Sequence, residues 1–244
     1  TGNVIVTFTA GSTVGAGSVT LTLTDNEGQI QAATAVLSIF EEGAPQVTAP
    51  ANTDVVQTKS KDITFTFTSE SGYNFSTLVA TGGTAVIKTD ATPGTASGSV
   101  VVTFTAARPT GAGSVVITMK DNNNKSGVAT AVLNVITWPT VSVSANIASN
   151  KTWGTDTIYI LEGRITVLDG ATLTIQHGAV VKGREGAESN ATALMVARGG
   201  KLMAEGTAVS PIIFTSVADH ILPGEIVSPN LEPTLNGLWG GLLI

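Results

Sequence analysis

Gly111-Ala-Gly-Ser-Val-Val-Ile-Thr-Met-Lys120 is the stretch that decides the fold class of the first half of this 244-residue chain. Its apolar residues Val115, Ile117 and Met119 stand at every second position. A period of two puts one set of side chains on a core and the other toward water, as in a half-buried antiparallel strand. The pattern therefore predicts strands rather than helices, and residues 63–68 repeat it.

The same stretch belongs to an internal repeat with an offset of 96 residues. Gly15-Ala-Gly-Ser-Val19 matches residues 111–115 without a gap. Over their whole length, segments 4–39 and 100–135 share 19 identical residues in 36 pairs. The repeat indicates a duplication, and we expect the two segments to superpose strand for strand.

Each copy carries an acidic turn between two strand patterns, Asp25-Asn-Glu-Gly28 in one and Asp121-Asn-Asn-Asn124 in the other. These residue types tolerate left-handed backbone and form hairpin loops. A calcium loop is the alternative, but neither turn has the spaced carboxylates and bidentate Glu of such a loop. We interpret both as hairpin turns, in a repeating unit typical of an immunoglobulin-like β-sandwich.

The offset predicts how the chain is divided into domains. Residues 1–42 are interpreted as the C-terminal half of an immunoglobulin-like domain and 43–137 as a complete one, with a hinge at 41–45. Half a sandwich cannot bury its own inner face, so its missing strands are expected upstream or from another chain. Residues 138–154 are interpreted as a linker and β-helix cap, followed by β-helix coils over 155–244.

The coil prediction comes from a second repeat, with an offset of 29 residues. Ile165, Val167 and Leu173 align with residues of the segment 194–202, namely Leu194, Val196 and Leu202. Short strands broken by glycines at this spacing are typical of a β-solenoid. We expect residues 238–244 to begin a third coil after a polar insertion at 217–236. The predicted fold class is all-β: tandem immunoglobulin-like β-sandwiches followed by the N-terminal coils of a parallel β-helix, with no α-helix beyond isolated turns.

Several stretches of this half resemble exported proteins of Bacteroidota that combine immunoglobulin-like repeats with a right-handed parallel β-helix. They are Ile158–Ile165, Thr172–Gly183, Ala193–Thr207, Pro211–Ser216 and Gly237–Leu243. The family usually has proline where this chain has His177. The resemblance implies an extracellular or outer-membrane surface location, with an anchor upstream and further coils downstream; it implies no activity, because the family is largely uncharacterised.

Composition excludes several classes of function. The net charge is −6 and the pI about 4.8, so no nucleic-acid partner is expected. No apolar run reaches the roughly 18–20 residues of a membrane span. The chain has no cysteine, which excludes disulfides, thiolate metal sites and a Cys nucleophile.

The residues that could perform chemistry are few. His177 and His220 are the only histidines. His177 is interpreted as an exposed turn residue, and His220 lies in the stretch 219–224 that opens the polar insertion. This insertion is the best candidate for a functional loop, with a plain surface excursion as the alternative. Trp153 and Trp239 could stack on sugars, but the first is expected to cover the open end of the coils and the second to pack in a coil.

A charged cluster surrounds the first coils and is interpreted as a solvated rim. Its members are Glu162, Arg164, Lys182, Arg184, Glu185 and Glu188. Because no nucleophile, phosphate-loop or metal-binding motif occurs, we assign no catalytic, cofactor-binding or metal-ligating residue and no cofactor.

These observations favour a non-catalytic cell-surface or secreted protein whose immunoglobulin-like stalk presents a β-helix. Its expected work is adhesion, binding of glycans or other surface proteins, or assembly into a larger surface structure. The alternative is a polysaccharide lyase or glycoside hydrolase whose active-site coils lie beyond residue 244. A purely structural spacer is a third possibility.

Overall fold

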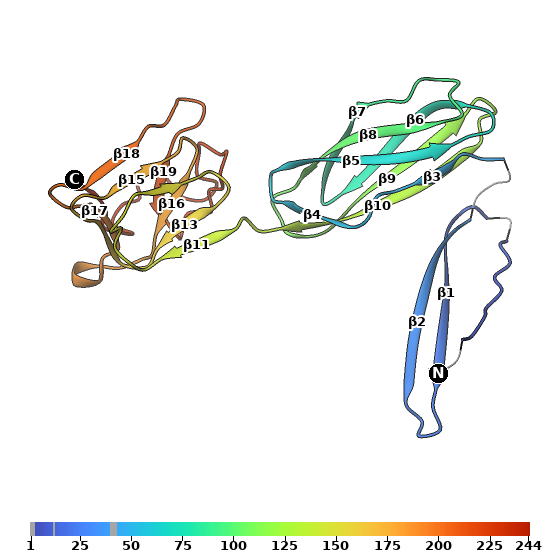
Figure 1. Ribbon diagram of the computed structural model, residues 1–244, viewed down its shortest axis with the longest axis horizontal. Helices are drawn as coiled ribbons and strands as arrows, with labels where there is room; N and C mark the ends of the chain where they lie inside the picture. Colours follow the sequence, from blue (N-terminus) through green and yellow to red (C-terminus); the bar gives the residue numbers. More distant parts are fainter. Residues whose placement is uncertain (1–2, 12, 40–42) are drawn as a thin grey trace. The chain divides into compact units, whose positions relative to one another are not determined.

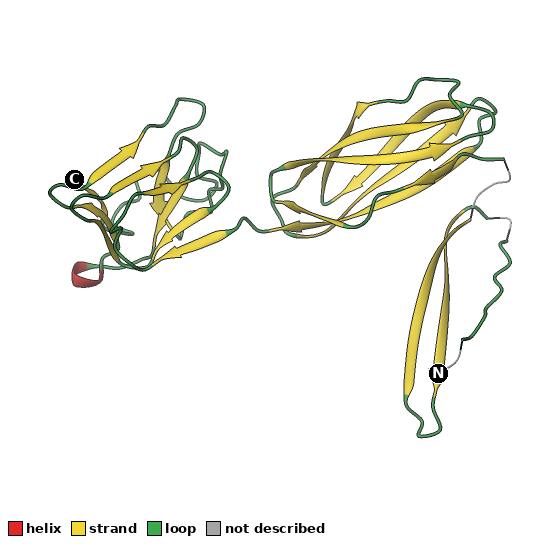
Figure 2. Ribbon diagram, viewed as in Figure 1, coloured by secondary structure: helices red, strands yellow, loops and turns green. Residues whose placement is uncertain are grey.

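The computed structural model describes residues 3–11, 13–39 and 43–244 and divides into two compact units, 1–137 and 138–244. Strands are the dominant regular secondary structure of the described residues, as predicted, and loops and turns make up nearly all of the rest (Figure 2). Their single helical element is the 3-10 turn η1 (Glu188–Asn190). None of the described residues forms a helix long and apolar enough to cross a membrane.

The first unit opens with an antiparallel hairpin, β1 (Gly15–Thr24) and β2 (Ile30–Ile39). Its register is identical to that of the hairpin β9 (Gly111–Asp121) and β10 (Ser126–Ile136), since Gly15 pairs with Ile39 as Gly111 pairs with Val135. The predicted equivalence of the two copies is therefore confirmed for the hairpin.

The two acidic residues close their turns in the same way. The carboxylate Oδ1 of Asp25 accepts bonds from the backbone N–H groups of Glu27 and Gln29 at 2.9 and 2.8 Å. Oδ1 of Asp121 accepts from Asn123 and Lys125 at 3.0 and 2.8 Å. The equivalent residues Gly28 and Asn124 both have left-handed backbone, with φ of 81° and 63°. The interpretation of both segments as hairpin turns is confirmed.

The expectation of strand-for-strand equivalence is wrong for residues 4–10. Their counterparts lie in β8 (Ser97–Ala106), which is hydrogen-bonded between β5 (Ser60–Thr68) and β7 (Gly83–Thr89). Residues 4–10 form no strand, because this sequence contains no equivalents of β5 and β7 for the first copy to pair with. The expected hinge at 41–45 falls partly outside the described residues.

The complete copy is a two-layer sandwich. One sheet has the order β3-β5-β8-β7 and the other β4-β10-β9-β6, with β3 at Gln46–Thr48, β4 at Thr53–Val56 and β6 at Tyr73–Thr81. β4 runs parallel to β10, and the other neighbours are antiparallel. This is the strand order of an immunoglobulin-like sandwich whose first strand is divided between the sheets. Fully buried Phe65, Phe104 and Ile117 lie at its centre.

The second unit is a parallel β-helix with three sheets (Figure 1). The first sheet contains β11 (Thr140–Val143), β13 (Ile158–Leu161), β16 (Val180–Gly183) and β19 (Ile213–Ser216). The second contains β14 (Arg164–Val167), β17 (Ala193–Val196) and β20 (Gly241–Leu243). The third contains β12 (Lys151–Trp153), β15 (Thr172–Ile175) and β18 (Lys201–Ala204).

The 29-residue repeat equals one coil of this helix. Ile165 pairs with Leu194 and Leu173 with Leu202 across adjacent parallel strands, as predicted. Inward side chains therefore stack coil on coil and bury the core. A third coil is present, because β19 pairs with β16 and β20 pairs with β17. It begins at β19, before the insertion, so the expectation that residues 238–244 begin it is wrong; β20 continues the coil after the insertion.

Two asparagines of residues 138–154 join this segment to the next coil. Asn146 Oδ1 accepts a bond from the backbone N–H of Thr166 at 2.9 Å, and Asn150 Oδ1 accepts from Thr172 at 3.0 Å. Trp153 is buried and stacks on Tyr159, with ring centroids 4.8 Å apart. The two side-chain amides therefore bond this segment to the next coil, and Trp153 belongs to the hydrophobic core of the β-helix.

Candidate functional site

One corner of the β-helix collects the long loops. We use the name corner loops for the connections between the first and second sheets. In the coil of β13 this connection is residues 162–163, in the coil of β16 it is 184–192, and in the coil of β19 it is 217–240. Because β13, β16 and β19 are neighbours in one sheet, the three connections lie on successive coils at the same corner (Figure 1). Insertions that gather on one face of a solenoid often form its binding face.

The longest corner loop is organised around Asp219. This residue is 5% exposed, and its carboxylate accepts bonds from the backbone N–H of Ile221 at 2.9 Å and from the hydroxyls of Ser228 and Thr215, each at 2.8 Å. Burial alone raises the pKa of Asp219, but these bonds and the nearby Lys182 outweigh it and lower the pKa below its usual value. Asp219 is therefore held as a carboxylate that fixes the loop.

Lys182 attaches this loop to the sheet. Its Nζ donates to the carbonyl oxygen of Asp219 at 2.6 Å, and the lysine is only 7% exposed. The interpretation of the charged cluster as a solvated rim is wrong for Lys182, because the folded loop shields its side chain from water. Its neighbour in register, Thr215, is the residue whose hydroxyl reaches the Asp219 carboxylate.

Next to this network the loop forms an open pocket of about 670 Å³. Polar groups of Asp219, Ser228, Asn230 and Glu232 line it together with apolar side chains. The apolar part consists of Ile226, Val227, Pro229, Leu231, Pro233 and Leu235. A concave surface that combines apolar walls with a few fixed polar groups suits a ligand or a partner's side chains.

The two shorter corner loops are joined by an ion pair between Glu162 and Arg184. Glu162 accepts bonds from the Arg184 guanidinium, one of them 3.0 Å long, and from the Ser142 hydroxyl at 2.7 Å. The Arg184 bonds hold the pKa of Glu162 below its usual range. A general acid needs a raised pKa, so neither Glu162 nor Asp219 is prepared to donate a proton.

The remaining candidates lie apart from this corner or at its edge. His177 is exposed in the turn before β16, with Nδ1 3.2 Å from the Ser210 hydroxyl. His220 is exposed in the corner loop, where its backbone N–H donates to Asn230 at 2.8 Å. Trp239 packs against the β-helix core, as expected. Among the described residues no group of three or more His, Asp or Glu side chains could hold a metal ion.

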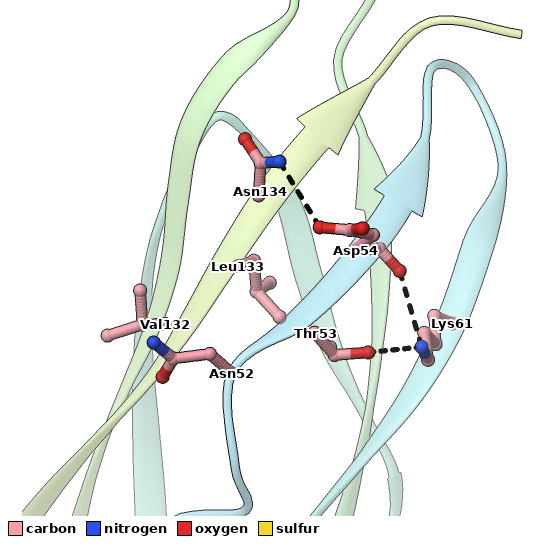
Figure 3. Close-up of a pocket in the computed structure, with 7 residues that line it drawn as sticks. All are labelled: Asn52, Thr53, Asp54, Lys61, Val132, Leu133 and Asn134. Carbon is pink, nitrogen blue, oxygen red and sulfur yellow. Dashed lines mark hydrogen bonds between the residues drawn. The ribbon is translucent and has the colours of Figure 1, made fainter.

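The sandwich has its own open pocket of about 460 Å³ at the edge where β4 meets β5 (Figure 3). Asn134 Nδ2 donates to Asp54 Oδ1 at 3.1 Å, and Lys61 Nζ donates to the carbonyl oxygen of Asp54 at 3.2 Å and to the Thr53 hydroxyl. Since Lys61 belongs to one sheet and Asp54 to the other, these bonds join the two sheets at their edge.

Sequence reasoning found the insertion but missed the pair of Lys182 and Asp219. Two features of the sequence could have indicated this pair. A lysine interrupts the apolar run Val180-Val-Lys-Gly183, and the insertion that follows the next strand has an aspartate, Asp219, near its start. The hydrogen bonds that Asn146 and Asn150 make to the next coil were also missed, because an isolated Asn before a strand is equally typical of a turn.

Residues 145–244 match a family described as a pectate-lyase-like beta helix domain. The match covers the β-helix and not the sandwich. No curated protein matches the chain.

Three solved structures resemble parts of the chain. The SrpA adhesin of Streptococcus sanguinis is 18% identical with a TM-score of 0.33, over 38% of this chain and 58% of that one. The GspB Siglec domain is 10% identical with a TM-score of 0.33, over 45% and 65%. An endo-fucoidan hydrolase of glycoside hydrolase family 107 is 20% identical with a TM-score of 0.30, over 51% and 19%. With TM-scores below 0.5, these likenesses carry no argument about function.

Proposed function

We propose that this chain is part of a non-catalytic protein of the cell surface or the extracellular space, in which immunoglobulin-like domains act as a stalk for a β-helix. The β-helix binds a glycan or a surface protein through its corner loops. We also propose domain boundaries at residues 42, 137 and 154. The sequence resemblance further supports an origin in Bacteroidota and a location at the outer membrane.

The observation that best supports binding is that the corner loops become longer over three successive coils. The other connections of the β-helix remain shorter than residues 217–240, so the extra sequence is concentrated where a partner could reach it. The loop is held in one shape by Asp219 and Lys182. A preformed loop loses little conformational freedom on binding, which favours affinity.

A glycan array and a panel of surface-protein fragments, probed with the labelled chain, test the proposal. We expect a ligand whose binding is weakened at least about tenfold, roughly 1.4 kcal/mol, by Leu235→Lys in the pocket. Val209→Lys is the matched control, because Val209 is an exposed apolar residue (89%) outside the corner loops. A ligand bound equally by both variants would place the binding surface elsewhere, and no ligand at all would favour a spacer.

A polysaccharide lyase or glycoside hydrolase is the second candidate, and the description of the matching family favours it. In this alternative the active-site coils lie beyond residue 244. Glu162 and Asp219 do not support a role as general acid, since the pKa values of both are lowered. Incubation of the full-length protein with acidic and neutral polysaccharides, followed by measurement of new reducing or unsaturated ends, decides between binding and cleavage.

A further inference from the structure

Most polar side chains of the corner-loop pocket are engaged within the loop and the strand before it. The Asp219 carboxylate accepts three hydrogen bonds, two of them from the hydroxyls of Thr215 and Ser228. The Ser228 hydroxyl also accepts a backbone N–H at 2.9 Å. The Asn230 amide accepts one backbone N–H at 2.8 Å and donates to one backbone carbonyl at 2.9 Å. These four side chains therefore retain few hydrogen-bonding groups for a ligand.

Glu232 is the exception among the polar side chains of the pocket. It is exposed, and among the described residues its carboxylate makes no hydrogen bond or ion pair. The three corner loops together contain six carboxylates and only one guanidinium, that of Arg184. The carboxylates belong to Glu162, Glu185, Glu188, Asp219, Glu225 and Glu232. The charge of the loops therefore favours a cationic group on the ligand, and Glu232 is a carboxylate with which such a group can pair.

Apolar side chains form the rest of the pocket. Ile226, Val227 and Leu235 line it and are 61%, 74% and 54% exposed. Exposed apolar side chains that gather at one place are typical of surfaces that bind a partner. Pro229 and Pro233 add apolar surface and have no backbone N–H to donate. The walls therefore suit aliphatic side chains, which gain by leaving water and need no hydrogen bonds.

A glycan fits this pocket poorly. A sugar ring is held by hydrogen bonds to its hydroxyl groups and by stacking of its C–H face on an aromatic ring. None of the described residues that line the pocket has an aromatic ring. Trp239, in the same corner loop, packs against the core instead. Acidic sugars would in addition be repelled by the excess of carboxylates. The pocket therefore favours a peptide over a carbohydrate.

We propose that this pocket binds a peptide segment of a partner protein, with aliphatic side chains against the apolar walls and one lysine or arginine beside Glu232. The proposal rests on the proposed binding function of the corner loops and narrows their ligand to a protein. The pocket volume of about 670 Å³ lies within the range of ligand-binding pockets, roughly 300–1,000 Å³. The loop is held in shape by Asp219 and Lys182, so the site exists before the peptide arrives.

An array of short capped peptides tests the predicted ligand. Each peptide combines Leu, Val, Ile and Pro with one Lys or Arg, and a matched peptide has Glu in place of the basic residue. The labelled full chain is the probe, and fluorescence polarisation in solution gives the affinities. We expect the basic peptides to bind at least about tenfold more tightly than their Glu counterparts, because only the basic residue is attracted to Glu232. Equal affinities for the two sets would overturn the proposal.

A reversal of charge in the pocket identifies the group that the basic residue meets. Glu232→Lys should remove the preference for basic peptides or convert it into a preference for the Glu peptides. Glu205→Lys is the matched control, because Glu205 is an exposed acid outside the corner loops, and this variant should keep the original preference. Both substitutions are at exposed positions, and thermal unfolding followed by circular dichroism checks that the fold is kept. If Glu232→Lys still prefers basic peptides, the proposal is wrong.

The glycan array separates failure of this inference from failure of the proposed function. A glycan that binds the chain and is lost in Leu235→Lys, with no peptide bound, would overturn the peptide ligand and leave the binding function of the corner loops intact. Binding of neither peptides, glycans nor surface-protein fragments would overturn both. A peptide that binds Leu235→Lys and the parent chain equally would show that it does not occupy this pocket, which also contradicts the inference.

Discussion

The side chain of Tyr73 lies in the sandwich core, where only 1% of its surface is exposed. Its hydroxyl donates a hydrogen bond to Asp90 and lies 2.9 Å from the Ser76 hydroxyl. Burial, together with the carboxylate of Asp90, raises the pKa of Tyr73 from 10.0 to about 12. The folded state therefore holds the phenol proton more tightly than the unfolded state.

This shift predicts how the sandwich responds to alkali. A raised folded-state pKa gives stability that is complete below pH 10 and is lost as the pH rises toward about 12. We expect the denaturation midpoint of residues 43–137, followed by circular dichroism, to fall over this interval. Tyr73→Phe has no phenol to titrate and should show a smaller decrease from its own lower starting stability. An equal slope in both proteins would show that Tyr73 does not control the response.

At the scale of the element, the strands were predictable where side chains alternate or repeat. The period of two predicts β5 and β9, and the offset of 29 residues predicts that Ile165 stacks on Leu194. Both patterns report on burial, which depends on local sequence and its periodicity. The hairpin turns were equally accessible, because Asp25 and Asp121 act on backbone groups within four residues.

What could not be predicted depends on partners distant in sequence. Residues 4–10 have the alternating pattern of a strand but form none, because alternation reports burial and not the presence of a pairing strand. Only the repeat offset indicated that the first copy lacks its first half. Lys182 is buried by a residue 37 positions later in the chain. The sequence therefore predicts the position of the candidate site as an insertion. It does not predict the hydrogen bonds within the loop or the pocket that the loop forms.

The third coil makes a close contact that a single methyl group would disturb. A Cβ added at Gly183, the end of β16, would lie 2.5 Å from the Trp239 ring. Because the ring would have to leave its place against the core, we expect Gly183→Ala to destabilise residues 138–244 by about 1–3 kcal/mol. Gly163→Ala is the matched control, since nothing lies within 4 Å of its added Cβ.

Thermal unfolding of both variants, with tryptophan fluorescence as the signal, measures the difference. The Gly183→Ala protein should unfold at a lower temperature and with a changed emission before the transition, because Trp239 becomes more exposed. If both variants unfold at the temperature of the parent chain, Trp239 does not depend on the close approach at Gly183.

At the scale of the whole molecule, the two units have separate hydrophobic cores. The core residues of the first unit lie between positions 47 and 135, and those of the second lie between positions 147 and 239. Each core includes enough completely buried side chains to support cooperative unfolding of its own unit.

Val167→Asp tests this independence. Val167 is completely buried in the β-helix and pairs with Val196, so an aspartate there places an unpaired carboxylate in the stack of inward side chains. The cost is on the order of several kcal/mol, comparable with the roughly 5–15 kcal/mol that stabilises a whole domain. We expect residues 138–244 to unfold while 43–137 keeps its transition, as seen by calorimetry and by hydrogen exchange resolved along the chain. Thr166→Asp, on the outward side of the same strand, should retain both transitions. Loss of both transitions together in Val167→Asp would mean that the β-helix and the sandwich fold as one cooperative unit, and a stalk that carries an independent binding module would then be the wrong description of this protein.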